Sequence, residues 1–106
     1  MSQSQVVKNN SGFLQFLAVC SAHQRQFLLR TASPEQLHVL VQVLYNILME
    51  YILIPEENKR NVLLVNLAET NVPYKTKKRI LVQEGDGFIQ DLLVPAVTSL
   101  NYELLI

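Results

Sequence analysis

Residues 33–54 carry the strongest hydrophobic pattern in this chain, because apolar side chains recur there at helical spacing and cover almost every side. After Gln36, the few polar side chains follow one another at every fourth position and form one narrow ridge; they are His38, Gln42, Asn46 and Glu50. A helix this apolar is typical of a central helix, surrounded by other helices or by a second copy of itself. We therefore predict a central helix over about residues 34–53. Its expected core or interface residues are Leu40, Leu44, Ile47 and Leu48.

Serine residues mark the beginning of two predicted helices. Ser33 can cap the free N–H groups of the central helix, and Gln36 can complete a capping box. Ser21 and Gln24 have the same spacing and predict an earlier helix, which runs through Arg30. The expected inward side chains of this earlier helix are Phe27, Leu28 and Leu29.

Proline and glycine residues divide the second half of the chain. Pro55 suits the beginning of a helix, which must end before Pro73 because a residue before proline avoids the helical region. The expected inward side chains of this helix are Val62, Leu63, Val65, Leu67 and Ala68. A short basic helix follows and is expected to end at Gly85. Gly85–Gly87 then forms a flexible joint, and Pro95 is expected to kink or split the helix after it.

These signals predict an all-α fold, a compact bundle of about four to six short helices around the central helix. A chain of 106 residues is long enough for one domain with a modest core. The expected organisation is a disordered N-terminal arm at residues 1–11, a helical domain at 12–84, a flexible glycine joint at 85–87 and an amphipathic C-terminal helix at 88–106.

The charge composition narrows the function classes. Nine Lys and Arg residues balance nine Asp and Glu residues, so the chain as a whole lacks the basic excess of an electrostatic nucleic-acid binder. Charged residues make up 17% of the chain, against about 25% in typical domains, which indicates that a partner covers part of the surface. Neither a signal peptide nor a membrane-spanning run is expected, so the predicted location is intracellular. The C-terminal helix carries no Lys or Arg, which argues against attachment to a membrane.

No pattern of catalytic or cofactor-binding residues stands out in the sequence. The glycine residues form no phosphate-binding loop, and neither His23 nor His38 has a metal-ligand partner at helical spacing. Cys20 is a single cysteine, which excludes an internal disulfide and argues against a zinc cluster; we expect it to be a small buried side chain. We therefore expect a non-enzymatic protein without catalytic residues, cofactor or metal ion.

A basic cluster lies ahead of the expected glycine joint. It consists of Lys75, Lys77, Lys78 and Arg79. These side chains are candidates for phosphate contact, either in a weak nucleic-acid site or in a nuclear-import signal. The alternative is a solvated helix face. A patch of this kind can act locally in a neutral protein, because the screening length at physiological salt is about 8 Å.

Several short motifs, taken in order, give the chain a family resemblance. They are Gln24-Arg25-Gln26 before Leu28-Leu29, Thr31-Ala32-Ser33-Pro34 before the central helix, Asn46-Ile47-Leu48 near its end, and Lys77-Lys78-Arg79 before Leu81-Val82-Gln83. Over roughly residues 13–95 the chain resembles small proteins of Polinton and adintovirus-type elements, which are DNA viruses and transposons related to adenoviruses. Members of this family tend to be strongly basic, whereas this chain is neutral, which argues against a role in packaging nucleic acid.

The resemblance gives the glycine joint a second interpretation. Adenovirus-type cysteine proteases cut virion precursors where Met, Ile, Leu, Asn or Gln is followed by any residue, Gly, any residue and Gly. This pattern is matched by Gln83, Gly85, Asp86 and Gly87, with the cut between Asp86 and Gly87. Glycine would let an extended backbone enter a narrow cleft. The alternative is an ordinary helix cap and turn.

The resemblance implies a minor virion-associated or accessory protein of an adenovirus-like virus or transposon, acting through helix-mediated contacts with a capsid or other protein. It would be found in the virion or in the host nucleus or cytoplasm. The alternatives are a helical adaptor that binds a host protein of the cell-death or signalling type, and a weak nucleic-acid-binding module. A homodimer is a further expectation, because the central helix carries more apolar faces than a small bundle is expected to cover.

Overall fold

All regular structure that the computed structural model describes is helical. The structure describes residues 5, 8–51, 59–69 and 71–98. Its elements are α2 (Ser11–Val19), α3 (Ala22–Thr31), α4 (Pro34–Tyr51), α5 (Lys59–Glu69), α6 (Tyr74–Phe88), the π-helical turn η1 (Ile89–Leu93) and α7 (Val94–Thr98). The predicted all-α bundle is therefore confirmed. None of the helices described is long and apolar enough to cross a membrane.

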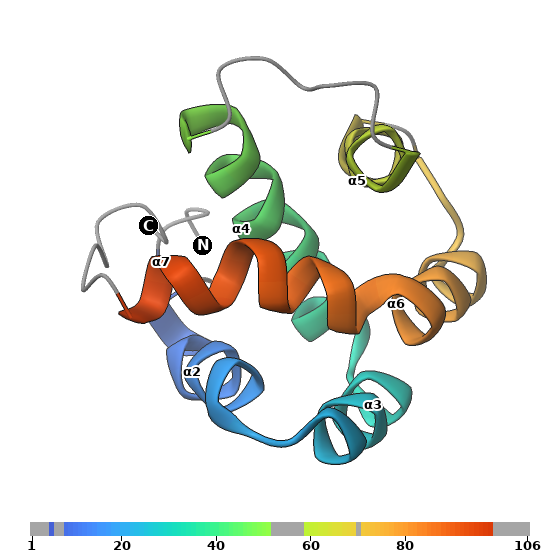
Figure 1. The fold of residues 1–106 in the computed structure, drawn as a ribbon. Helices are drawn as coiled ribbons and strands as arrows, with labels where there is room; N and C mark the ends of the chain where they lie inside the picture. The colour runs from blue at the N-terminus through green and yellow to red at the C-terminus, as the bar shows by residue number, and fades with distance from the viewer. Residues whose placement is uncertain (1–4, 6–7, 52–58, 70, 99–106) are drawn as a thin grey trace.

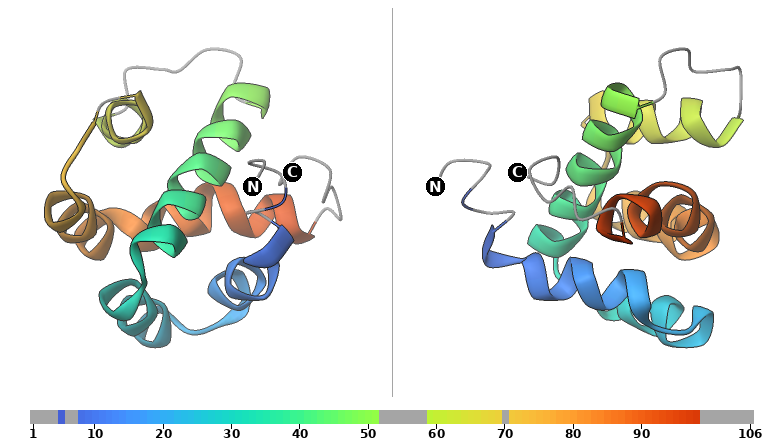
Figure 2. Two further views of the ribbon diagram at one scale, coloured as in Figure 1. Left: turned by 180° about the vertical axis from the view of Figure 1, so that it is seen from behind. Right: turned by 60° about the vertical axis from the view of Figure 1, so that its left-hand side comes forward.

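Helix α4 passes through the middle of the bundle, as predicted for the central helix (Figure 1). The helix formed by α6, η1 and α7 crosses one side of it, and α4 lies nearest the viewer when the molecule is seen from behind (Figure 2, left). The four predicted core residues are at most 3% exposed; they are Leu40, Leu44, Ile47 and Leu48. One chain thus covers the apolar faces of α4 from Leu37 to Leu48, which removes the argument for a homodimer built on this helix.

The predicted capping boxes are present at both helices. Ser33 Oγ accepts the backbone N–H of Gln36 at 3.1 Å, and Gln36 Oε1 accepts the N–H of Ser33 at 2.9 Å. Ser21 and Gln24 make the same reciprocal pair at the start of α3. These hydrogen bonds satisfy N–H groups that a helix leaves without partners. Because they join residues only three positions apart, both helix starts could be predicted from the sequence.

A hydrogen bond joins α4 to α5 at the surface. The Tyr45 hydroxyl donates to Oε1 of Glu69 at 3.0 Å. This hydrogen bond to a carboxylate raises the pKa of Tyr45 above its ordinary value, because it favours the protonated phenol. The contact fixes the end of α5 beside α4, against which α5 packs.

The inward faces of α3 and α5 differ from those predicted. Phe27 is 64% exposed, and Arg25 is buried in its place, whereas the predicted Leu29 is buried and Leu28 is half-buried. Val62 is 52% exposed, and Leu64 is buried beside Leu67. The three remaining predicted residues of α5 are half-buried; they are Leu63, Val65 and Ala68. A helix turns only one stripe inward, and in α3 this stripe is set by the hydrogen bonds of Arg25 described below.

The expected helix end at Gly85 and the flexible joint at 85–87 are wrong. Helix α6 includes all three residues and continues through η1 into α7 without a break. Gly85 is buried, and a Cβ atom added to it would lie 2.7 Å from Cδ1 of Leu29. The glycine therefore serves a close approach of α3 and α6 instead of a turn.

Pro95 does not split the C-terminal helix. A proline ring crowds the carbonyl group one turn before it, and the wider π turn at Ile89–Leu93 gives the ring room there. The helix continues to Thr98 and packs on α2. Its buried side chains are Ile89, Leu92, Leu93, Ala96 and Val97. Residues 89–98 thus contribute to the core. Residues 99–106 lie outside the described residues.

The expected N-terminal arm is wrong where the structure describes it. Gln5, Lys8 and Asn9 are helical. Asn10 is buried and its Nδ2 donates to Oε2 of Glu35 at 3.3 Å, which ties the start of α2 to the start of α4. Residues 1–4 and 6–7 lie outside the described residues.

Replacing Gly85 by Ala is expected to lower the free energy of unfolding by about 1 kcal/mol. Overpacking against buried Leu29 costs about 1–3 kcal/mol, which outweighs the gain of about 1 kcal/mol in helix propensity. Urea denaturation measures the change. Gly12→Ala is the matched control, because nothing lies within 4 Å of the added atom, and it should stabilise the protein by about 0.5–1 kcal/mol. An equal gain in both variants would contradict the close approach of α3 and α6.

Candidate functional site

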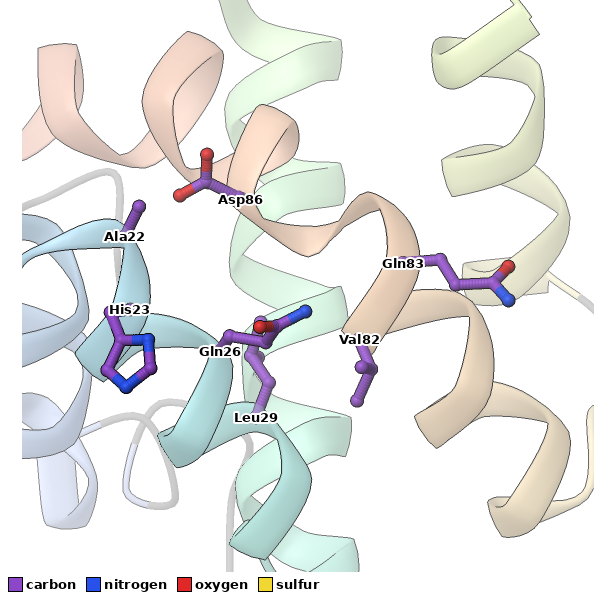
Figure 3. Close-up of a pocket in the computed structure, with 7 residues that line it drawn as sticks. All are labelled: Ala22, His23, Gln26, Leu29, Val82, Gln83 and Asp86. Atoms are coloured by element: carbon purple, nitrogen blue, oxygen red, sulfur yellow. The ribbon is translucent and has the colours of Figure 1, made fainter.

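An open groove runs between α3 and α6 and is the candidate functional site (Figure 3). Its volume is about 340 Å³. It is lined by Ala22, His23, Gln26, Leu29, Val82, Gln83 and Asp86. We call this feature the α3–α6 groove. It joins two segments that are far apart in the sequence and that pack closely together.

The α3–α6 groove combines an apolar centre with polar edges. Leu29 and Val82 contribute apolar surface between the helices, and the side chain of Gln26 points from α3 toward α6 (Figure 3). Asp86 lies at one end, next to the first turn of α3. An arrangement of a few polar groups around apolar surface is typical of a site that binds a ligand or a peptide.

Arg25 holds this end of the groove together. Its Nε donates to the carbonyl oxygen of Leu17 at 2.7 Å, and its Nη2 donates to those of Cys20 at 3.2 Å and Ala18 at 3.4 Å. Its Nη1 forms a 2.6 Å ion pair with Oδ1 of Asp86. The guanidinium group thus caps the last turn of α2, whose carbonyl groups have no partner within the helix, and links it to α6.

The two partners of this ion pair differ in exposure. The Arg25 side chain is 5% exposed, whereas the Asp86 side chain is 45% exposed and also accepts a hydrogen bond from Nε2 of Gln90 at 3.0 Å. Among the described residues, no buried side-chain nitrogen or oxygen lacks a hydrogen-bond partner. A charged group can be buried at this point because its donors are satisfied.

The structure divides the predicted basic cluster. Lys78 Nζ donates to the Tyr74 hydroxyl at 2.8 Å and lies 5.0 Å from the centre of the tyrosine ring. The Tyr74 hydroxyl in turn donates to the carbonyl oxygen of Ala32 at 2.8 Å. Lys78 therefore helps to fix the start of α6 against the end of α3. Lys75 and Arg79 are exposed.

Helical spacing places Lys75 and Arg79 along the α3–α6 groove. Arg79 is one turn before Val82 and Gln83, and Lys75 is one turn before Arg79. Lys77 follows a different stripe of α6, because it precedes Leu81 by four positions. By this spacing two of the four predicted phosphate-contacting residues share the side of α6 that faces the groove, although they do not line it, and Lys77 does not share that side.

The helix dipole of α6 does not favour the basic side chains at its start. They occupy its first two turns, where the helix dipole is positive, and the first turn contains no acidic residue. The cap residue Pro73 makes no side-chain hydrogen bond to the helix. Cations at this end are mildly unfavourable for the helix, and they make the adjoining end of the groove electropositive.

The four residues of the expected protease site lie in the last turns of α6. Gln83 is exposed at the groove, Gly85 is buried against α3, Asp86 bonds to Arg25, and Gly87 is half-buried. None of them is in the extended conformation that a protease cleft accepts. Cutting between Asp86 and Gly87 would require this part of α6 to unwind.

The two histidine residues lie on different helices. His23 lines the groove, whereas His38 lies on the outer ridge of α4. Cys20 is half-buried, less than expected, and its Sγ donates to the carbonyl oxygen of Leu17 at 3.7 Å. The described residues contain no group of three His, Cys, Asp or Glu side chains that could hold a metal ion.

Sequence reasoning missed the structural role of Arg25. A signal was present, because Arg25 is four residues before Leu29 and shares its helix stripe. A charged residue on the inward stripe of a helix indicates a buried partner. The partner itself, Asp86, lies 61 positions away and could not be identified from spacing.

Comparisons of the chain with models of protein families, with curated proteins and with solved structures found no match. The resemblance to adintovirus-type proteins therefore stays a prediction.

Replacing Arg25 by Lys is expected to lower the free energy of unfolding by about 2–3 kcal/mol. Lysine keeps the charge but cannot reach three carbonyl groups and a carboxylate at once, which leaves buried acceptors without partners. Thermal and urea denaturation measure the loss. Arg30→Lys is the control on the same helix, where the side chain is exposed, and it should change stability by less than about 0.5 kcal/mol. Equal stability of the two variants would show that the guanidinium fork has no structural role.

Proposed function

We propose that this chain is a non-enzymatic protein-binding module and that the α3–α6 groove receives a short extended segment of its partner. The observation that carries this proposal is the open groove of about 340 Å³ between α3 and α6. Its walls are joined by the Arg25–Asp86 ion pair at one end and by the Tyr74–Ala32 hydrogen bond at the other.

Preformed walls support binding because little ordering is needed when a partner enters. The ion pair and the contact between Gly85 and Leu29 hold the two helices close together. The groove volume of about 340 Å³ is less than that of one turn of a second helix, since a helix with its side chains is about 10–12 Å wide and rises about 5.4 Å per turn. An extended segment fits better, since Leu29 and Val82 can contact its apolar side chains and Gln26 can bond to its backbone.

The biological context remains the one that the resemblance implies. We propose a minor virion-associated or accessory protein of an adenovirus-like element, with a capsid protein as the partner. A host protein is the alternative, and the same groove would serve either. The identity of the partner separates the two roles.

Filling the groove is expected to abolish binding. Peptides that bind are first selected in a peptide-display screen against the folded protein. Gln26→Trp should lower the affinity for these peptides by about tenfold or more, because the indole occupies the space between α3 and α6. Fluorescence polarisation with the best peptides measures the change. The control is Phe27→Trp, which adds an indole at the neighbouring exposed position facing away from the core and should change affinity by less than about twofold. Circular dichroism checks that both variants fold.

Two outcomes would overturn the proposal. One is a screen that yields no binder, and the other is a set of binders that tolerate Gln26→Trp as well as Phe27→Trp. In either case the groove would not be the binding site of this protein.

Processing by an adenovirus-type protease is expected to depend on unfolding. The folded chain should resist cutting between Asp86 and Gly87, because α6 must unwind and the Arg25–Asp86 pair must break first. Mass spectrometry after incubation with the protease measures the rate. A synthetic peptide of residues 78–92 should be cut readily, and the Arg25→Lys variant should be cut several-fold faster than the wild type. A folded chain that is cut as fast as the peptide would contradict this expectation.

A further inference from the structure

We infer that the segment received by the α3–α6 groove is acidic, with carboxylate side chains that contact Arg30, Arg79 and Lys75. This inference rests on the proposed function and names the chemistry of the partner. It depends on the charges that flank the groove, which the neutral composition of the chain conceals.

Cationic side chains gather at one end of the α3–α6 groove. Arg30 is one turn after Gln26 on α3, and Arg79 and Lys75 continue the stripe of Val82 on α6. All three cations are exposed. Among the described residues, none of them forms an ion pair with a carboxylate; the ion pair that the described residues do form joins Arg25 and Asp86.

The groove's own carboxylate is already occupied. Asp86 accepts from Arg25 and from Gln90, so it does not neutralise the cations at the other end. The charge of a partner segment must therefore balance that of the flanking cations. Complementary charge of this kind raises the association rate and rejects segments of the opposite sign.

The span from Lys75 to Asp86 sets the length of the segment, because the flanking cations extend beyond the residues that line the groove. Lys75 and Asp86 are eleven positions apart, which corresponds to about 16 Å along a helix. An extended chain covers this distance with about five residues, since it advances about 3.3 Å per residue. Alternate side chains of such a segment point to the same side, so acidic residues at every second position can reach the cations.

A nucleic acid fits this site less well. Single strands bind proteins through aromatic side chains on which the bases stack, and the groove lining contains no Phe, Tyr or Trp. The Asp86 carboxylate at one end is 45% exposed and would repel a phosphate. A peptide tolerates this carboxylate if its acidic side chains lie toward Arg79.

Two matched peptide-display libraries test the inference. They are identical except that one carries Glu and the other Gln at alternate positions, and both are selected on the wild-type protein. Groove-dependent binders are those whose affinity falls in the Gln26→Trp variant. They should come predominantly from the Glu library. The strongest Glu peptide is then labelled with fluorescein and titrated at low and at physiological salt. A single-stranded oligonucleotide of about seven nucleotides serves as the competitor.

The cluster itself offers a matched control for this titration. Arg79→Gln and Lys77→Gln each remove one positive charge from α6, but Lys77 lies on the stripe of Leu81, away from the groove. Arg79→Gln should lower the affinity for the peptide by at least about fivefold, and Lys77→Gln should lower it by less than about twofold. The loss caused by Arg79→Gln should shrink as salt is raised.

The failures of the two proposals are distinguishable. Groove-dependent binders that come equally from the Gln library would overturn the acidic partner and leave the binding groove intact. Equal losses in Arg79→Gln and Lys77→Gln would show a diffuse charge effect and would also overturn it. Full displacement of the peptide by the oligonucleotide at physiological salt would favour nucleic acid instead. A complete absence of groove-dependent binders would overturn both proposals.

Discussion

The arrangement of helices around the groove depends on one buried guanidinium group. Arg25 belongs to α3, donates hydrogen bonds to the last carbonyl groups of α2 and forms an ion pair with Asp86 of α6. The consecutive helices α2 and α3 and the distant helix α6 thus converge on one side chain. The desolvation of this charge is tolerable only because each of its three nitrogen atoms donates to an oxygen atom, so the positions of α2, α3 and α6 depend on one another.

This constraint gives the groove its properties. The ion pair closes one end, the contact of Gly85 with Leu29 brings the helices together, and Tyr74 fixes the other end. What remains between them is a short, rigid depression with glutamine, leucine and valine side chains and with exposed cations beside it. A neutral protein thereby carries exposed cations beside a groove whose lining carboxylate, Asp86, is already paired with Arg25.

The residues of the predicted protease site and of the basic cluster have structural roles that differ from those predicted. Asp86 is an acceptor for a buried arginine, and Gly85 is a packing residue in the middle of a long helix. The pattern of a protease site is still present in the sequence, but in the folded chain it is helical. The basic cluster is divided among a structural contact, the groove and an unrelated stripe of α6.

The sequence by itself determined the all-α class, the central helix and the two capped helix starts. These features depend on local periodicity and on hydrogen bonds between residues three positions apart, such as Ser33 and Gln36. Only the tertiary structure decided that Arg25 points inward, that Phe27 points outward and that Gly85 continues a helix. The inward position of Arg25, which leaves Phe27 outward, depends on Asp86 and on the carbonyl groups of α2. The helical position of Gly85 depends on its close contact with Leu29 of α3. A local pattern carries no information about such partners, because the folded chain alone brings them within bonding distance.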